Sequence, residues 1–175
     1  DASFNFTLAL DGDGKVWSWG ASNGGQLGYF RVNQPGRPQV VDSLPPCTAI
    51  AAGRFHAMVL TRGGGVFSFG NNSNGQLGHA QQSGSPSIIK GLSGKKVTAI
   101  AAAGWSSCAL LADGRVFAFG LLNAQKQSFP VALEGVPSCR SVSAGGALCF
   151  AISDYGWVIR FGAFVRTEEV SSRAW

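Results

Sequence analysis

The stretch Thr48–Gly70 reads TAIAAGRFHAMVLTRGGGVFSFG, and it returns without a gap as Thr98–Gly120, TAIAAAGWSSCALLADGRVFAFG. The same frame is found before them in Phe6–Gly20, FTLALDGDGKVWSWG, and after them in Val142–Gly162, VSAGGALCFAISDYGWVIRFG. Internal similarity at a period of roughly 40–50 residues is typical of a fold assembled from repeated supersecondary units. The fold class therefore has to be argued from the unit rather than from the whole chain.

Each unit contains the elements of a β-hairpin. The apolar run Ala57–Leu60 is continuous rather than alternating, which is typical of a strand covered on both faces. In the third unit Asp113 and Gly114 then supply the turn, because Asp-Gly adopts the positive φ that a tight hairpin needs. Trp17 and Trp19 stand on the following aromatic strand where other units have Phe, so we expect them to pack in the core. The aromatic strands end in four structural repeat positions: Gly20, Gly70, Gly120 and Gly162.

Two further segments make the unit four-stranded. A run of small residues, Ala49–Gly53 in the second unit, predicts an inner strand where backbones approach closely. A proline opens a last short strand in three units, at Pro38, Pro86 and Pro130, where an outer strand loses no central hydrogen bond. Four antiparallel strands are the blade of a β-propeller. The sequence therefore predicts an all-β fold, a partial or open propeller with about four blades.

The blades are expected to form a single propeller-repeat domain over residues 1–175. The chain starts inside a blade and Ala163–Trp175 has no Pro-led outer strand, so we expect about three and a half repeats. Three interpretations remain open: a fragment of a longer chain, an open arc held by partners, or two copies completing one ring. An open arc would expose unpaired strand edges that another part of the chain or a partner must cover. This favours a fragment of a longer chain or an open arc held by partners. The predicted units are 1–47, 48–97, 98–139 and 140–175.

One combination of motifs resembles a known family. Gly53 and His56 precede the hairpin, Val66–Gly70 ends it, and Gly75–Gly78 then reads Gly-Gln-Leu-Gly. This pattern resembles the regulator of chromosome condensation repeat family over nearly the whole chain. In that pattern His56 and the loop glutamines Gln26 and Gln76 are structural repeat positions.

The resemblance implies both a shape and an activity. Family members typically close about seven blades into a ring. The founding member is a guanine nucleotide exchange factor for a Ran-like small GTPase, and it acts through a hairpin inserted in a blade. This sequence departs from the pattern in three ways: Phe6 and Ser106 stand where His56 stands, Leu121–Gln125 replaces the third Gly-Gln-Leu-Gly loop, and the fourth unit has lost most of the pattern.

Composition indicates a folded, basic chain. Hydrophobic residues make up 45% and charged residues 13%, with a formal net charge of +5, and the charges do not cluster in sequence. No apolar stretch is long enough to span a bilayer, so no membrane insertion is expected. The cysteines form no metal-binding spacing, so we expect buried free thiols and an intracellular location, with nucleus, cytoplasm and mitochondrion not distinguished. They are Cys47, Cys108, Cys139 and Cys149.

No catalytic constellation is recognisable in the sequence. The chain has two histidines: His56 is expected to pack within the repeat, and His79 to face solvent. Asp11–Gly14 is similar to the start of a calcium loop but lacks the later oxygen ligands, so turn chemistry explains it better. We therefore predict a protein that is not an enzyme, with no catalytic residue, cofactor or metal site.

The repeated strands and varied loops favour a protein-interaction scaffold, and we expect its partners to be other proteins of a larger complex. The turn after Gly53 and the Gly-Gln-Leu-Gly loops are expected on one face of the propeller. Loops such as Arg31–Arg37 and Ala80–Ser85 differ between units. Two alternatives are exchange activity on a Ran-like small GTPase, and nucleic-acid or ribonucleoprotein association through a basic surface. The predicted partner contacts are Arg54, Asn23, Asn72 and Asn74.

Overall fold

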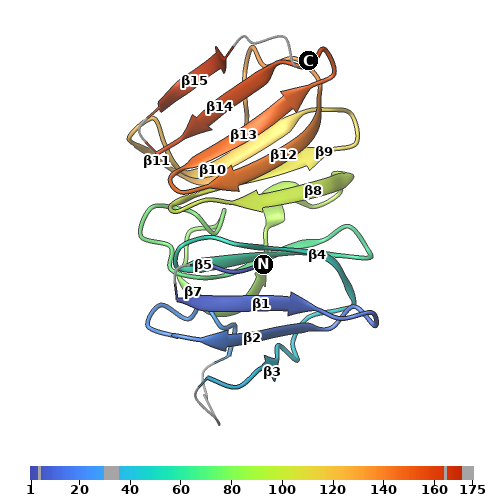
Figure 1. Cartoon of the computed structure of the whole chain (residues 1–175), viewed down its shortest axis with the longest axis vertical. Helices are drawn as coiled ribbons and strands as arrows, with labels where there is room; N and C mark the ends of the chain where they lie inside the picture. Colours follow the sequence, from blue (N-terminus) through green and yellow to red (C-terminus); the bar gives the residue numbers. More distant parts are fainter. Residues whose placement is uncertain (4, 30–35, 164, 171–175) are drawn as a thin grey trace.

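Antiparallel β-sheets follow one another along the chain in the computed structural model, which describes residues 1–3, 5–29, 36–163 and 165–170 (Figure 1). Part of the Arg31–Arg37 loop lies outside the described residues. The first sheet contains β1 (Phe6–Leu10), β2 (Val16–Gly20) and β3 (Gln39–Val40). The second contains β4 (Cys47–Ala52), β5 (His56–Thr61), β6 (Val66–Gly70) and β7 (Ser83–Ile88). The third contains β8 (Val97–Ala102), β9 (Ser106–Leu111), β10 (Val116–Leu122) and β11 (Gln125–Ala132), and the fourth β12 (Cys139–Gly145), β13 (Leu148–Ser153), β14 (Val158–Gly162) and β15 (Val165–Val170).

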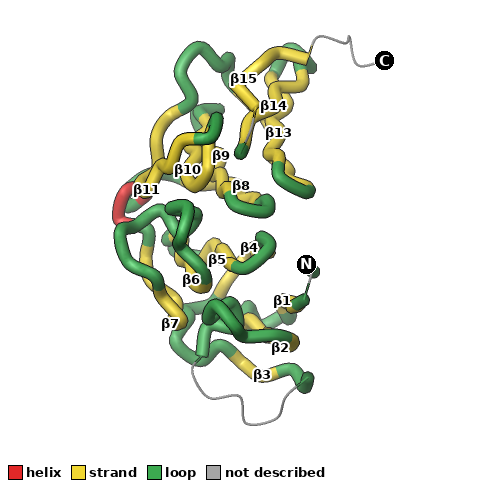
Figure 2. Tube along the Cα trace, turned by 90° about the vertical axis from the view of Figure 1, so that its left-hand side faces the viewer, coloured by secondary structure: helices red, strands yellow, loops and turns green. Residues whose placement is uncertain are grey.

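The sheets are arranged as propeller blades. Within each sheet the strands are hydrogen-bonded in chain order, so the chain meanders from an inner to an outer strand. Seen along the strands, β4 and β8 lie on the inner side and β7 and β11 on the outer side (Figure 2). The described sheets do not close into a ring. The predicted all-β, partial propeller with antiparallel four-stranded blades is confirmed.

The fourth sheet corrects one expectation. The segment after Ala163 carries no leading proline, yet Val165–Val170 forms the outer strand β15 and pairs with β14 between Gly162 and Val165 and between Val158 and Val170. Pairing of an outer strand depends on backbone hydrogen bonds along one edge, so proline is tolerated there but not required. At the other end, an isolated bridge between Ala2 and Thr7 continues the first sheet inward.

The core lies between successive sheets. Phe69, Phe119 and Phe161 each belong to a different interface cluster and are at most 1% exposed. Because side chains alternate along a strand, the second aromatic residue of each aromatic strand points toward the preceding sheet. Trp17 and Trp19 point the same way from the first sheet, where no described sheet covers them. They are therefore half-buried rather than core residues.

A glycine ends each aromatic strand because the backbone of the neighbouring strand leaves no room. Gly70 has a φ of 112°, and a Cβ there would lie 2.5 Å from the Phe55 carbonyl oxygen and 2.8 Å from the His56 Cα. The left-handed φ and this close approach together require glycine.

The expected buried free thiols are confirmed: Cys47, Cys108, Cys139 and Cys149 are all buried and none is in a disulfide. Among the described residues no helix is long and apolar enough to cross a bilayer.

Candidate functional site

Two kinds of connection meet on one side of the blades, which we call the loop face. It comprises the turns 53–55, 103–105 and 146–147 and the loops 21–28 and 71–82. The turn and the loop of one blade are joined by the same backbone bond each time, as in the N–H of Asn71 donating to the Phe55 carbonyl at 2.8 Å. Equivalent bonds run from Ala21 to Asn5, from Leu121 to Trp105 and from Ala163 to Ala147. The framework therefore holds these connections in fixed relative positions.

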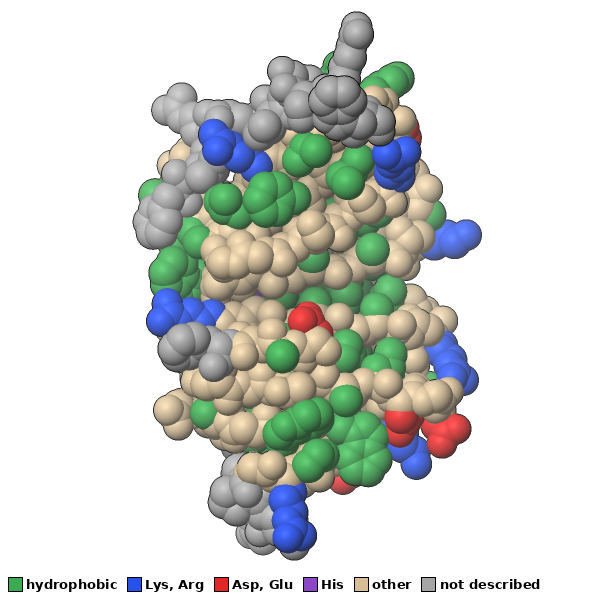
Figure 3. Space-filling view, in the orientation of Figure 1, with side chains coloured by type: hydrophobic (Ala, Val, Ile, Leu, Met, Phe, Trp, Pro, Cys, Tyr) green, Lys and Arg blue, Asp and Glu red, His purple; other side chains and the backbone are tan. Residues whose placement is uncertain are grey.

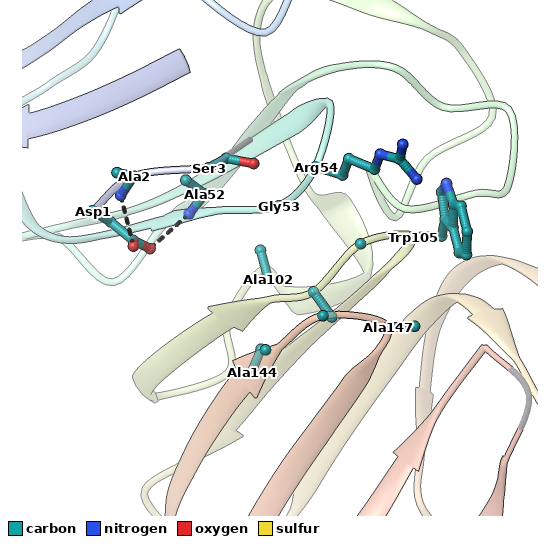
Figure 4. A pocket seen from close by; sticks show the side chains of 14 residues that line it. Asp1, Ala2, Ser3, Ala52, Gly53, Arg54, Ala102, Trp105, Ala144 and Ala147 are labelled. Carbon is teal, nitrogen blue, oxygen red and sulfur yellow. Dashed lines mark hydrogen bonds between the residues drawn. The ribbon is translucent and has the colours of Figure 1, made fainter. Parts of the chain in front are cut away.

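A pocket of about 550 Å³ opens where the inner strands meet (Figure 4). Its walls come from the three turns of the loop face and from the N-terminal segment, so four blades contribute to it. Most of the lining is alanine and glycine, whose small side chains leave the space between the inner strands unfilled. We call this space the axial pocket.

Arg54 and Trp105 form one wall of the axial pocket. The Arg54 guanidinium carbon lies 5.7 Å from the Trp105 ring centre and 5.2 Å from the Phe55 ring centre. Arg54 is exposed and Trp105 half-buried, and the two side chains lie side by side although they come from different blades (Figure 4). Cation–π contacts of this kind hold a guanidinium in place without neutralising its charge.

The opposite wall already holds a carboxylate. Asp1 accepts hydrogen bonds from the Ala52 N–H through Oδ2 and from the Ala2 N–H through Oδ1, each at 2.9 Å (Figure 4). Ala52 ends the inner strand β4. A backbone N–H at the inner edge of a blade can therefore receive a carboxylate inside this pocket.

The Gly-Gln-Leu-Gly loops are held by their glutamines. Gln76 is 1% exposed; its Oε1 accepts from the Asn74 N–H at 2.9 Å and its Nε2 donates to Asn71 Oδ1 at 3.0 Å. Gln26 accepts from the Gly24 N–H at 2.8 Å, but its Nε2 has no hydrogen-bond partner in the part of the chain that the structure describes, because Ala21 stands where the second loop has Asn71. Both glutamines serve the loop structure rather than its surface.

The four predicted contact residues lie in different environments. Arg54 and Asn23 are exposed on the loop face, and Asn74 is half-buried. Asn72 is only 6% exposed: its amide donates to the carbonyls of His79 and Gln81 and accepts from the Leu77 N–H. The structure therefore gives Asn72 a role inside its own loop, leaving the other three on or near the accessible surface.

His56 joins the second and third blades. It is fully buried, its Nε2 lies 2.8 Å from Ser107 Oγ, and Ser107 in turn donates to the Gln76 carbonyl at 2.8 Å. Since that bond uses the only hydroxyl hydrogen of Ser107, His56 Nε2 is the donor of the first. Burial lowers the pKa of His56 to about 3, so the ring is neutral.

His79 does not face solvent as expected. It is half-buried, its Nε2 is buried with no hydrogen-bond partner within the described ranges, and desolvation lowers its pKa. Asn72 holds the carbonyls of His79 and Gln81 against its own loop, and this path leaves the His79 ring only partly exposed to water.

Asp11 performs turn chemistry. Its carboxylate accepts from the backbone N–H groups of Asp13 and Lys15 and from Trp17 Nε1 at 2.9 Å, and the Trp17 bond is the main cause of its lowered pKa. Within the described ranges no group of three His, Cys, Asp or Glu side chains could hold a metal ion.

Sequence reasoning missed Trp105 and Asp1 as pocket residues. The gapless alignment of Trp105 with Phe55, the neighbour of Arg54, was a usable signal, because it places Arg54 and Trp105 in equivalent turns of adjacent blades. Asp1 gave no such signal, since a single terminal acidic residue has no pattern around it.

Comparison with known proteins identifies the repeat. The profile of the regulator of chromosome condensation (RCC1) repeat matches residues 13–60 and 63–110, together more than half of the chain, and a second profile of the same description matches residues 47–76. Part of the E3 ubiquitin-protein ligase MYCBP2 of Danio rerio is 40% identical over 58 residues, which are 33% of this chain and 1% of that protein.

Solved structures share the fold. Human WBSCR16 superimposes with a TM-score of 0.84 at 24% identity, over 96% of this chain and 50% of that one. Prp20p of Saccharomyces cerevisiae gives 0.85 at 21% identity, over 97% of this chain and 49% of that one, and its structure was described together with its binding to Gsp1p and histones. The chain thus spans about half the length of these structures. At these identities the likeness shows the fold alone.

Proposed function

Because the chain belongs to the RCC1 repeat family, we propose that it is a non-catalytic protein-interaction scaffold that works within a larger assembly through its loop face. The observation that carries the proposal is the repeated bond between turn and loop in each blade, which fixes variable side chains on a rigid framework. Protein partners are named for one fold relative, Prp20p, which binds Gsp1p and histones. The buried free thiols support an intracellular location for this scaffold.

The test compares the two sides of the molecule. A loop-face variant carries Arg54→Ala, Asn23→Ala and Asn74→Ala, and a control variant carries Lys15→Ala and Arg62→Ala on the opposite side. The full-length proteins are expressed with a tag, and the bound proteins are quantified by mass spectrometry. We expect the loop-face variant to lose most of its specific partners and the control to keep them. Retention of all partners by the loop-face variant would show that this face is not the interface.

The alternative function is guanine nucleotide exchange on a small GTPase. It is supported by the binding of Gsp1p by the fold relative Prp20p. The links between the described sheets, such as 89–96, contain no inserted hairpin that could act as the wedge of the founding member. A nucleotide-release assay with a panel of small GTPases tests it: acceleration by the full-length protein would make exchange the better proposal.

A further inference from the structure

The loop face contains two Asn-Gly pairs, Asn23-Gly24 and Asn74-Gly75. Asparagine is a thermolabile residue, and it loses its side-chain amide most readily before glycine, which has no Cβ to hinder attack by its backbone nitrogen. The two pairs lie in equivalent loops but not at equivalent positions, because Gly75 aligns with Gly25 and Asn23-Gly24 therefore stands one residue earlier. The structure thus places the same chemical pair in two different environments.

The second pair is held by the turn itself. The Gly75 N–H donates to the Asn72 carbonyl at 3.0 Å, and this bond closes the turn. Gly75 is buried, and a Cβ built on it would lie 2.7 Å from the Gln127 carbonyl oxygen of the next blade. The Asn74 N–H is also fixed, since it donates to Gln76 Oε1 at 2.9 Å. The backbone on both sides of the Asn74 side chain is therefore held in place.

The first pair is held by a single side-chain bond. Asn23 is exposed and Gly24 is half-buried. The Gly24 N–H donates to Gln26 Oε1 at 2.8 Å, whereas the N–H that closes this turn belongs to Gly25 and donates to the Ser22 carbonyl at 3.3 Å. Gln26 Nε2 has no hydrogen-bond partner among the described residues, so this glutamine lacks the second anchor of its counterpart.

The two glycine nitrogens also differ in their place within the turn. The Gly24 nitrogen belongs to the central peptide plane, which rotates in the change from a type I to a type II turn while the closing bond stays. Glycine accepts the positive φ that a type II turn needs at that position. The Gly75 nitrogen instead carries the closing N–H, so its rotation breaks the turn. The backbone rotation that deamidation requires is therefore easier at Asn23 than at Asn74.

We propose that Asn23 is a site of spontaneous deamidation in the folded protein, whereas the fold protects Asn74. The Gly24 nitrogen gives up its proton and attacks Asn23 Cγ, the bond from Cγ to the amide nitrogen breaks, and ammonia leaves with that proton. Water then opens the five-membered succinimide at either carbonyl, which gives aspartate or isoaspartate. The net change is uptake of one water molecule and release of one ammonia, so the step needs no oxidant or reductant.

The reaction places a carboxylate at an exposed position of the loop face. In Figure 3 the left-hand edge, where β2 ends and the loop 21–28 begins, shows no Asp or Glu side chain. Isoaspartate also adds a carbon atom to the backbone of the loop. Asn23 is one of the residues through which the proposed scaffold contacts its partners, but the inference does not rest on that function, because it depends only on the covalent and hydrogen-bond structure of the loop.

The experiment compares the folded and unfolded protein. The full-length protein is incubated in mildly alkaline buffer made with heavy-oxygen water, with and without urea, and peptide mapping by mass spectrometry follows both sites. A serine precedes each pair, Ser22 and Ser73, so the unfolded chain offers both sites a similar local sequence. In the folded protein we expect Asn23 to react at least about tenfold faster than Asn74, because the second turn must first open. In urea we expect the two rates to agree within about threefold.

A variant tests the role of the attacking nitrogen. Gly24→Ala should slow the reaction at Asn23 about tenfold through steric hindrance and leave the rate at Asn74 unchanged. Circular dichroism checks that the variant is folded. Equal rates at the two sites in the folded wild type would overturn the inference. A rate at Asn23 that folding reduces as strongly as the rate at Asn74 would overturn it too, because the Gln26 bond would then protect the first pair as well as the turn protects the second.

Discussion

His56 stabilises its blade interface only as a neutral ring. It donates from Nε2 to Ser107, and its buried Nδ1 has no hydrogen-bond partner among the described residues. Protonation would place an additional N–H and a full charge in a site from which water is excluded, and this desolvation cost lowers the pKa to about 3. In the unfolded chain the same ring titrates near its ordinary value of 6.5. The difference between the two pKa values makes folding depend on pH.

The sign of that dependence follows from proton uptake. The pKa of His56 is lower in the folded chain than in the unfolded chain. The contribution of the neutral ring to the free energy of unfolding is therefore complete above pH 6.5 and is lost as the pH falls toward about 3. Between pH 6.5 and 5 we expect a loss of about 2 kcal/mol from this residue. Urea unfolding at several pH values measures it. His56→Gln should flatten the slope while His79→Gln keeps most of it, and equal slopes in the wild type and His56→Gln would contradict the assignment.

Gly53 is required by the same histidine. A Cβ at this position would overlap the His56 imidazole and the Ala103 carbonyl oxygen, which belongs to the next blade. We expect Gly53→Ala to lower the free energy of unfolding by about 2–3 kcal/mol, as overpacking does in a tight core. The matched control is Gly12→Ala, because nothing lies within 4 Å of a Cβ there. Chemical denaturation of both variants makes the comparison, and equal stabilities would show that the histidine moves aside freely.

For single residues, the sequence predicted where a side chain lies in the repeat better than which groups it contacts. The loop position of Gln76 follows from a pattern that repeats, whereas the role of Asn72 does not. An asparagine in a polar loop can turn its amide toward solvent or toward its own backbone, and the outcome depends on the path of residues 79–81. That path has no counterpart elsewhere in the chain, so no repeat pattern could reveal it.

Among the elements, the hairpin between β10 and β11 is the most divergent. It replaces the Gly-Gln-Leu-Gly loop by a two-residue turn in which Asn123 and Ala124 have φ of 49° and 59°. Their N–H groups donate to the carbonyls of Gly162 and Ala163 in the next blade. A shorter loop therefore still ties one blade to its neighbour, now through the backbone.

The backbone of this turn is strained at Ala124, and a glycine there would relieve the strain. Alanine is unfavourable at positive φ, and Asn-Gly is the preferred pair for a two-residue hairpin. We expect Ala124→Gly to raise the free energy of unfolding by about 0.5–1 kcal/mol. The control is Ala112→Gly in an exposed turn without positive φ, which should lower it by about the same amount. Thermal and urea denaturation report both changes; a destabilised Ala124→Gly protein would mean that the Ala124 methyl group makes a contact worth more than the strain.

The strands and their order were predictable because the hairpin signals recur in every unit. The outer strand β15 was not predictable, since backbone pairing at an edge leaves little trace in the side-chain pattern. The proline that precedes the outer strand in other units is tolerated there but is not needed for the strand to form.

For the whole molecule, the arc has two kinds of sheet face. The interfaces between described sheets are filled by buried clusters, whereas the outward faces of the first and fourth sheets have no described sheet against them. Phe119 and Trp19 occupy the same position in their repeats, but Phe119 is 0% exposed and Trp19 is half-buried. The repeat pattern could not reveal this difference, because it depends on which neighbour each blade has.

The two aromatic residues should therefore differ in energy as well as in exposure. In the 175-residue chain we expect Phe119→Ala to cost about 3–5 kcal/mol, since it leaves a cavity between two blades. Trp19→Ala should cost about 1 kcal/mol or less, although tryptophan is the larger side chain. Urea denaturation measures both, with Phe69→Ala as a second interior position. Equal costs for Trp19 and Phe119 would mean that another surface covers the first sheet in solution, such as a second copy of the chain, and a concentration dependence of the unfolding midpoint would then identify that copy as the cover.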